Sequence, residues 1–300
     1  MKKKELFYGV ATALITPFKN GEVDRESFLS LLDHQVESGI DALVIGGTTG
    51  EAATLSDKER YTLFSLARER CQGKVRLIFG TGTNDTSLAI KHTKEAERIG
   101  CDGILVVTPY YNKGTAEGIA RHYEYIADSV DLPIILYNVP QRTGVNLEFS
   151  MLERLAKIEN IVGIKEAADS ADRLVSVAAF GDELHLYAGN DSAVFTVLSL
   201  GGKGVISVVS NLLPYEMSEL CRLFKVGEVE RARERQIKLL PLIRAMFLET
   251  NPAPIKYAAT RWRERLGAGG LTEELRLPLC EVSERTRAQI DVALDCWVRQ

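Results

Sequence analysis

Eight short apolar runs, separated by longer amphipathic stretches, are the feature that most constrains how this chain folds. Each run has four to six residues rich in Val, Ile and Leu, without a regular polar alternation. Such continuous runs are typical of strands covered on both faces, as in parallel sheets. The predicted strands are Val10–Ile15, Ala42–Ile45, Val75–Phe79, Gly103–Val107, Pro133–Tyr137, Ile161–Lys165, Leu184–Ala188 and Gly204–Val208.

The stretches between the runs carry helix signals. Asp24 precedes a periodic apolar set, Ser56 and Glu59 form a capping box, and Thr86 precedes a helical stretch that ends at Gly100. Eight strand–helix repeats predict an α/β fold, a closed (β/α)8 TIM barrel, because eight parallel strands can pair every edge. An open doubly wound sheet is the alternative, but its GxGxxG signature is absent.

The strand signal ends after about Val226. Three further helices are predicted, over Val229–Glu249, from Pro252 and Pro254 onward, and after Ser283. We therefore expect a catalytic barrel over residues 1–227 and a C-terminal helical domain over residues 228–300, which would support oligomer contacts.

Charge and cysteine usage exclude several classes of function. The net charge is −4, with basic and acidic residues interleaved, so no nucleic-acid footprint is present. The five cysteines and four histidines are scattered, which indicates reduced thiols and no metal site. Lys2–Lys4 and the following apolar stretch resemble a secretory signal, but the stretch is too short. No apolar run reaches the ~20 residues of a membrane span. We expect a cytoplasmic protein without a membrane partner.

The active sites of such barrels lie at the C-terminal ends of the strands, where Lys165 ends the sixth predicted strand. Strict alternation places Ile161, Gly163 and Lys165 on one face and Val162 and Ile164 on the other. A lysine that points into the barrel mouth is desolvated, which lowers a lysine pKa and provides a neutral amine for Schiff-base formation. A lysine extending from the rim to water is the equally weighted alternative.

Two further features lie at the same end of the barrel. Tyr137 ends the fifth strand and shares its inward face with Ile135, so its phenol can serve an imine-forming lysine as a proton carrier. A buried tyrosine bonded to backbone is the alternative. The loop Gly46–Glu51 offers close backbone approach and two hydroxyls, which suit a carboxylate, a phosphate or a plain tight turn.

Taken together, seven segments resemble the dihydrodipicolinate synthase (4-hydroxy-tetrahydrodipicolinate synthase) family, within the N-acetylneuraminate lyase superfamily of pyruvate-dependent class I aldolases. The resemblance covers almost the whole chain, and seven segments in one order are far more specific than any single motif. They are Gly46–Glu51, Thr108–Asn112, Tyr137–Gly144, Gly163–Ala167, Gly189–Ser192, Gly204–Val208 and Asn251–Lys256.

The resemblance implies catalytic roles for four residues. Lys165 would form the imine with pyruvate. Tyr137, Thr48 and Tyr111 would form a proton relay, with Tyr111 reaching across a subunit interface.

It also implies substrate-binding residues. Thr49 and the Thr48 backbone would hold the pyruvate carboxylate, the Ile206 carbonyl would line the pocket, and Gly189 would contact substrate. Arg142 would bind the carboxylate of aspartate 4-semialdehyde, because a guanidinium pairs with a carboxylate in bidentate fashion. A salt bridge within the loop is the alternative for Arg142.

The implied reaction condenses the two substrates, pyruvate and L-aspartate 4-semialdehyde, to the cyclic lysine precursor of diaminopimelate biosynthesis. No cofactor is implied, because the lysine imine is the electron sink. Family members are homo-oligomers, usually tetramers and otherwise dimers.

Three other functions compete with this interpretation. One is a sister aldolase, such as N-acetylneuraminate lyase or a sugar-acid aldolase. Another is a phosphate-ester barrel enzyme that uses Gly201–Gly204 as its phosphate cradle. The third is a silent pyruvate-binding scaffold.

The chain departs from the family where lysine-inhibited members carry an acidic residue and histidines. Leu88, Asp57 and Arg60 occupy these positions here. Leu88 cannot pair with an ammonium group, so we expect weak or absent feedback inhibition by lysine.

Overall fold

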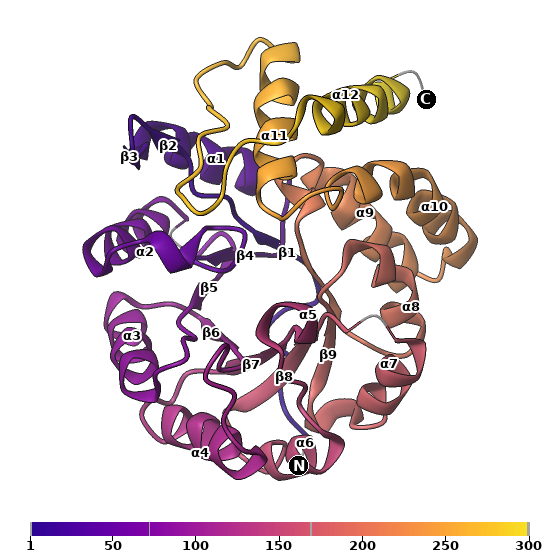
Figure 1. Ribbon diagram of the computed structural model, residues 1–300. Coiled ribbons are helices and arrows are strands. Elements are labelled where there is room, and N and C mark those ends of the chain that lie inside the picture. The colour runs from indigo at the N-terminus through magenta and orange to yellow at the C-terminus, as the bar shows by residue number, and fades with distance from the viewer. Residues whose placement is uncertain (1, 72, 169, 299–300) are drawn as a thin grey trace.

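Eight parallel strands close into a barrel in the order β1-β10-β9-β8-β7-β6-β5-β4, which confirms the predicted TIM barrel. The computed structural model describes residues 2–71, 73–168 and 170–298. Figure 1 shows the ring of helices that surrounds the strands. The barrel strands are β1 (Gly9–Ala13), β4 (Ala42–Ile45), β5 (Arg76–Gly80), β6 (Gly103–Val107), β7 (Ile134–Asn138), β8 (Ile161–Glu166), β9 (His185–Ala188) and β10 (Gly204–Ser207).

The helices occupy the stretches between the strands and the C-terminal part of the chain. A short hairpin of β2 (Phe18–Lys19) and β3 (Glu22–Val23) precedes the first of them. They are α1 (Arg25–Glu37), α2 (Asp57–Cys71), α3 (Thr86–Ile99), α4 (Ala116–Ala127), α5 (Pro140–Thr143), α6 (Phe149–Leu155), α7 (Ala171–Ala178), α8 (Val194–Ser199), α9 (Pro214–Lys225), α10 (Val229–Ala245), α11 (Ala253–Arg265) and α12 (Glu284–Val298).

The helix starts follow the capping signals with one correction. The Asp24 carboxylate accepts from the Ser27 N–H, and Ser56 and Glu59 bond reciprocally, as the capping box predicts. In α3, Asp85 is the N-cap and Thr86 is the first helical residue, because the Asp85 carboxylate satisfies the free N–H groups of the first turn.

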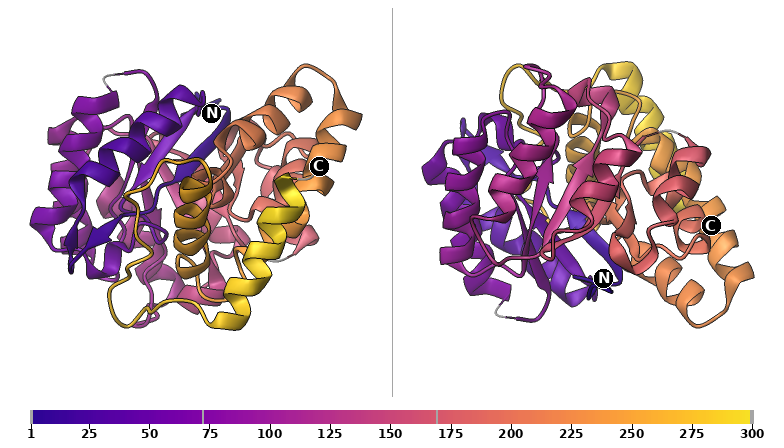
Figure 2. Two further views of the ribbon diagram at one scale, coloured as in Figure 1. Left: turned by 90° about the horizontal axis from the view of Figure 1, so that it is seen from above. Right: turned by 90° about the horizontal axis from the view of Figure 1, so that it is seen from below.

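The last three helices, α10 to α12, lie against one side of the barrel (Figure 2). The predicted helix over 229–249 ends earlier, at Ala245, and α11 begins after Pro252. Within the described ranges, no helix is both long and apolar enough to cross a membrane.

Two apolar clusters explain the barrel's packing. One lies between the strands and the helices and includes Ile134, Leu136 and Ile164. The other contains inward residues of the strands, such as Ile135 and Ile206, and fills the barrel interior. Residues of one strand alternate between the two clusters, as the pleat requires.

A segment before β1 covers the end of the barrel at which the strands begin. The Lys3 ammonium, buried, donates to the carbonyls of Ala156, Ile158 and Ile161 at 2.6, 2.8 and 2.6 Å. The Phe7 ring stacks on Tyr187 with a centroid distance of 4.4 Å. This segment closes the floor of the barrel.

Candidate active site

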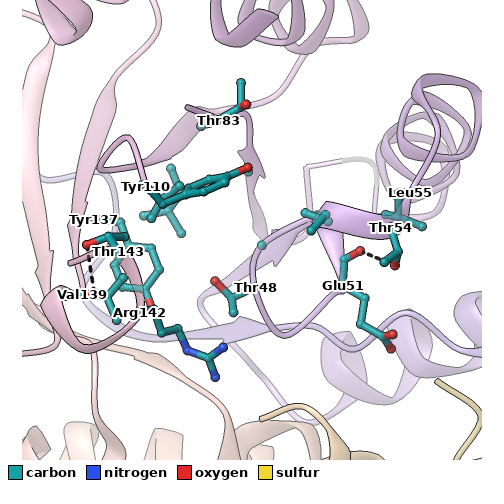
Figure 3. A pocket seen from close by; sticks show the side chains of 18 of the residues that line it. Thr48, Glu51, Thr54, Leu55, Thr83, Tyr110, Tyr137, Val139, Arg142 and Thr143 are labelled. Carbon is teal, nitrogen blue, oxygen red and sulfur yellow. Dashed lines mark hydrogen bonds between the residues drawn. The ribbon is translucent and has the colours of Figure 1, made fainter. Parts of the chain in front are cut away.

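A cavity of about 790 Å³ opens at the end of the barrel where the strands finish. Four residues with predicted roles line it: Thr48, Tyr111, Tyr137 and Arg142. Figure 3 shows Thr48 between Tyr137 and Arg142 on one side and Glu51 on the other. The structure therefore gathers side chains from two loops, the short helix α5 and the end of a strand around one space.

Lys165 and Tyr137 are partners in the ladder between β8 and β7. Both are buried, at 5% and 7% exposure, and the Lys165 Nζ lies 4.2 Å from the centroid of the Tyr137 ring. The expectation that Lys165 points inward is confirmed, whereas a lysine extending to water would be exposed. The pair joins an amine and a phenol in one buried contact.

The strand alternation predicted for β8 is wrong at its start. Ile161 packs in the outer cluster and Val162 in the inner one. The physical reason is a register shift in the β7–β8 ladder, where Ile134 pairs with Ile161 but Ile135 pairs with Gly163. Such an irregularity inserts one residue and re-aims those around it. Regular pairing resumes from Gly163 onward, so the inward direction of Lys165 is unaffected.

The loop after β4 is a compact series of turns. The Gly50 N–H donates to the Gly47 carbonyl, and the Glu51 N–H donates to the Thr48 carbonyl. Thr49 is buried, and its Oγ1 accepts a hydrogen bond of 3.0 Å from the Asn251 Nδ2. Thr48 lines the cavity while Thr49 is tied to the C-terminal part of the chain.

The loop ends in a buried ion pair. Lys256 and Glu51 side chains are 0% and 1% exposed, with 2.5 Å between Nζ and Oε1. The Lys256 Nζ also donates to the Glu274 carbonyl and lies 4.3 Å from the Phe18 ring centroid. Burial lowers the pKa of Lys256, and the Glu51 carboxylate opposes that shift. Helix α11 is thereby anchored to the loop that carries Thr48.

Arg142 lies on α5, exposed at the cavity. Its Nη2 donates to the Asn251 carbonyl at 3.0 Å. Among the residues that the structure describes, it makes no ion pair, so the alternative of a loop salt bridge finds no support. Its charge is available to an anionic ligand.

Tyr111 lines the cavity but is largely open to solvent. It is 89% exposed and has a positive φ of 71°, an uncommon backbone conformation for a non-glycine residue. The predicted reach across a subunit interface remains a prediction.

The residues that line the cavity do not include Ile206 and Gly189, nor Thr49 and the buried Lys165 behind Tyr137. Ile206 is fully buried in β10 and pairs with Ala11. The Gly189 N–H donates to the Glu166 carbonyl at 2.7 Å, and an added Cβ would lie 2.6 Å from that of Ala167. Close packing against the end of β8 thus explains why a glycine stands at position 189. The substrate-binding roles of Ile206 and Gly189 remain predictions.

Two residues without a predicted role complete the site. Asn251 bonds Thr49 through its side chain and Arg142 through its carbonyl. Asp191 is buried, and its Oδ2 accepts from the N–H groups of Val208 and Val209. Burial raises the pKa of Asp191, a shift opposed by hydrogen bonds and by the Lys165 charge. Both residues lie in motifs of the family pattern, but only the folded chain shows their contacts.

The three positions that depart from the family pattern also line the cavity. Asp57 accepts from the Lys91 ammonium at 2.6 Å. The Arg60 guanidinium donates to the carbonyls of Gly80 and Ala52. Leu88 adds an apolar side chain to this wall.

No group of three or more His, Cys, Asp or Glu side chains could hold a metal ion in the described part of the chain. The site offers an amine, phenols, hydroxyls and the guanidinium groups of Arg60 and Arg142. A barrel whose mouth holds a buried lysine against a tyrosine has the construction of a Schiff-base-forming class I aldolase.

Comparison with known proteins identifies the family. The model of the dihydrodipicolinate synthetase family matches residues 6–296, and the chain belongs to this family. The 4-hydroxy-tetrahydrodipicolinate synthase of Thermotoga neapolitana is 48% identical over 94% of this chain and 95% of its own length.

Solved structures agree with the fold. The crystal structure of dihydrodipicolinate synthase from Thermotoga maritima superposes with a TM-score of 0.93 at 44% identity, over 99% of this chain and 100% of the other. The enzyme from Acinetobacter baumannii, solved as a complex with pyruvate, gives a TM-score of 0.92 at 38% identity, over 97% and 98%.

Proposed function

We propose that the protein is a lyase that condenses pyruvate with L-aspartate 4-semialdehyde to 4-hydroxy-tetrahydrodipicolinate, the precursor of diaminopimelate and lysine. The observation that carries this proposal is the buried contact of 4.2 Å between the Lys165 Nζ and the Tyr137 ring. Membership in the family supports the choice of substrates.

The reaction begins at Lys165. Its amine attacks the pyruvate ketone, and loss of water gives an imine. Loss of a methyl proton then gives an enamine, whose carbon bonds to the aldehyde carbon of the second substrate. The amino group of that substrate attacks the imine carbon, releases Lys165 and closes the ring. Overall, one pyruvate and one aspartate 4-semialdehyde give the cyclic product and one water.

Each proton transfer needs a nearby hydroxyl. Tyr137 is in contact with Lys165, and Thr48 lines the same cavity, so these two are proposed to move protons to and from the ketone oxygen. Tyr111, supplied by a partner subunit, is the proposed outer member of the relay. Its 89% exposure leaves it free to enter a neighbouring site.

The two carboxylates need fixed partners. The pyruvate carboxylate is proposed to bind to Thr49 and the Thr48 backbone, beside the Ile206 carbonyl and Gly189. Arg142, which makes no described ion pair, is proposed to bind that of the semialdehyde.

Assembly and location follow from the same assignment. We propose a cytoplasmic homo-oligomer, a tetramer or the dimer within it, because Tyr111 would complete a neighbour's site. We also propose a division into a catalytic barrel over residues 1–227 and a helical domain over 228–300. The Lys256–Glu51 pair then ties that domain to the catalytic loop.

Borohydride reduction with pyruvate, followed by peptide mass mapping, tests the proposal. One lactyl-sized adduct is expected, on the peptide that contains Lys165, and Lys165→Ala should lose it. Lys238→Ala is the matched control, because Lys238 lies over the Trp297 ring far from this chemistry and should leave the adduct intact. An adduct that persists in Lys165→Ala would overturn the assignment. Assays with aspartate 4-semialdehyde and with N-acetylneuraminate then separate this enzyme from its sister aldolases.

A further inference from the structure

The ladder pair that follows Tyr137 and Lys165 consists of Asn138 and Glu166. Their side chains lie on the opposite face of the strands, away from the barrel interior, because successive residues alternate. Asn138 is fully buried, and the Glu166 side chain is 0% exposed. A carboxylate without water contact directly beside the imine-forming lysine requires partners of its own.

Glu166 finds those partners on three elements. The Asn138 Nδ2 from β7 donates to its two oxygens at 2.9 and 3.0 Å. The Ala168 N–H, just after β8, donates at 2.9 Å. The Arg173 Nε from α7 donates at 3.0 Å. We refer to Asn138, Glu166 and Arg173 as the carboxylate cluster.

The carboxylate cluster also holds the segment that carries Arg142. This segment leaves β7 at Val139, and its return is fixed at Leu147. The Leu147 N–H donates to the Asn138 Oδ1 at 3.1 Å, and the Arg173 Nη2 donates to the Leu147 carbonyl at 2.6 Å. Both ends of the segment are thus tied to the cluster.

We propose that the carboxylate cluster is a positioning unit of the active site, acting through Tyr137, Lys165 and Arg142. Asn138 and Glu166 fix the ends of β7 and β8 relative to one another and so set the contact between the amine and the phenol. Arg173 fixes the segment of Arg142, the residue proposed for the second carboxylate. The inference rests on the proposed function and extends it to residues that touch no substrate.

The separate roles of Glu166 and Arg173 predict different kinetic effects for their variants. Glu166→Gln keeps the volume of the side chain and an acceptor for Asn138 but removes the charge. Imine trapping with pyruvate alone should slow by roughly ten- to a hundred-fold, the effect of misplacing reacting groups by about 1 Å. Arg173→Met releases the segment and also removes one of the donors to Glu166, while the Asn138 and Ala168 donors remain. The KM for aspartate 4-semialdehyde should rise roughly ten-fold, and pyruvate trapping should slow less than in Glu166→Gln.

A conservative variant and a matched ion pair provide the controls. Arg173→Lys keeps the charge beside Glu166 and should give an intermediate KM. Arg154→Met removes an arginine that pairs with Glu117 and Glu124 on the outer helices, and it should change neither kinetic parameter. Thermal unfolding of each variant identifies any that are unfolded, in which case Arg173→Lys carries the comparison.

The outcomes separate the inference from the proposed function. If wild type fails to trap pyruvate on Lys165, the proposed function is wrong. If wild type traps pyruvate and folded Glu166→Gln and Arg173→Met match it in trapping rate and in KM, the positioning role is wrong. An equal loss in Arg154→Met would also overturn it, since the effect would then be general destabilisation.

Discussion

Removing the charge of Lys256 tests how strongly the C-terminal helices are coupled to the catalytic loop. Lys256→Met keeps an unbranched side chain over the Phe18 ring but removes the ammonium that bonds Glu51 and the Glu274 carbonyl. The Glu51 carboxylate is then buried with only the Arg276 N–H, at 3.1 Å, as a described donor.

The magnitude follows from that isolated charge. Breaking a buried pair by removing one partner destabilises a protein by about 3–5 kcal/mol. For a chain of this size, the melting temperature should fall on the order of 10 °C. The neutral double variant Glu51→Gln/Lys256→Met leaves no buried charge, and exchanging a buried pair for uncharged residues is often close to neutral. It should recover most of the lost stability.

Thermal and urea unfolding of wild type, both single variants and the double variant form the required double-mutant cycle. The KM for pyruvate, measured on the folded variants, reports on Thr48 and Thr49. We expect a positive coupling energy and a raised KM in Lys256→Met. A single variant as stable as wild type, or a double variant whose loss equals the sum of the single losses, would refute the reasoning.

Three further predictions concern pH, regulation and the subunit interface. Burial lowers the pKa of His122 from 6.5 to about 4 in the folded protein. At a pH between 4 and 6.5, the imidazole is therefore protonated mainly in the unfolded chain. Stability should therefore fall by about 3 kcal/mol as the pH drops from 6.5 to 4, and urea unfolding should show a shallower fall in His122→Gln; equal slopes would contradict this. Inhibition by L-lysine should be weak or absent in a titration of activity, because Leu88 is apolar and Asp57 already accepts from the Lys91 ammonium; strong, saturable inhibition at sub-millimolar lysine would disprove it. Tyr111→Phe should lower kcat by roughly a hundred-fold while pyruvate trapping persists, and an unchanged kcat would remove Tyr111 from the relay.

The strands could be predicted from the sequence because each is a short run dominated by apolar residues. The ends of all eight differ by at most two residues from the runs named at the outset, as in β1, predicted over 10–15 and observed at Gly9–Ala13. The inward direction of Lys165 also followed from the pleat. The faces of Ile161 and Val162 did not, because the register shift depends on how β8 meets β7 and leaves no local signal.

The supporting residues of the site were beyond prediction for a related reason. Asn251 reaches Thr49 across 202 positions of the chain, and Lys256 reaches Glu51 across 205. Sequence patterns report local periodicity, whereas these contacts exist only once the barrel has closed and the C-terminal helices have docked. Family motifs identified the segments but not which side chains meet.

The floor of the barrel has a consequence for synthesis of the chain. Lys3 leaves the ribosome well before its carbonyl partner at Ala156, which follows 153 residues later. At about 5–20 residues per second, the segment waits roughly ten to thirty seconds before those carbonyls emerge. The base of the enzyme is therefore closed only after this segment has waited for its partners, and any factor that binds the segment during synthesis postpones that step.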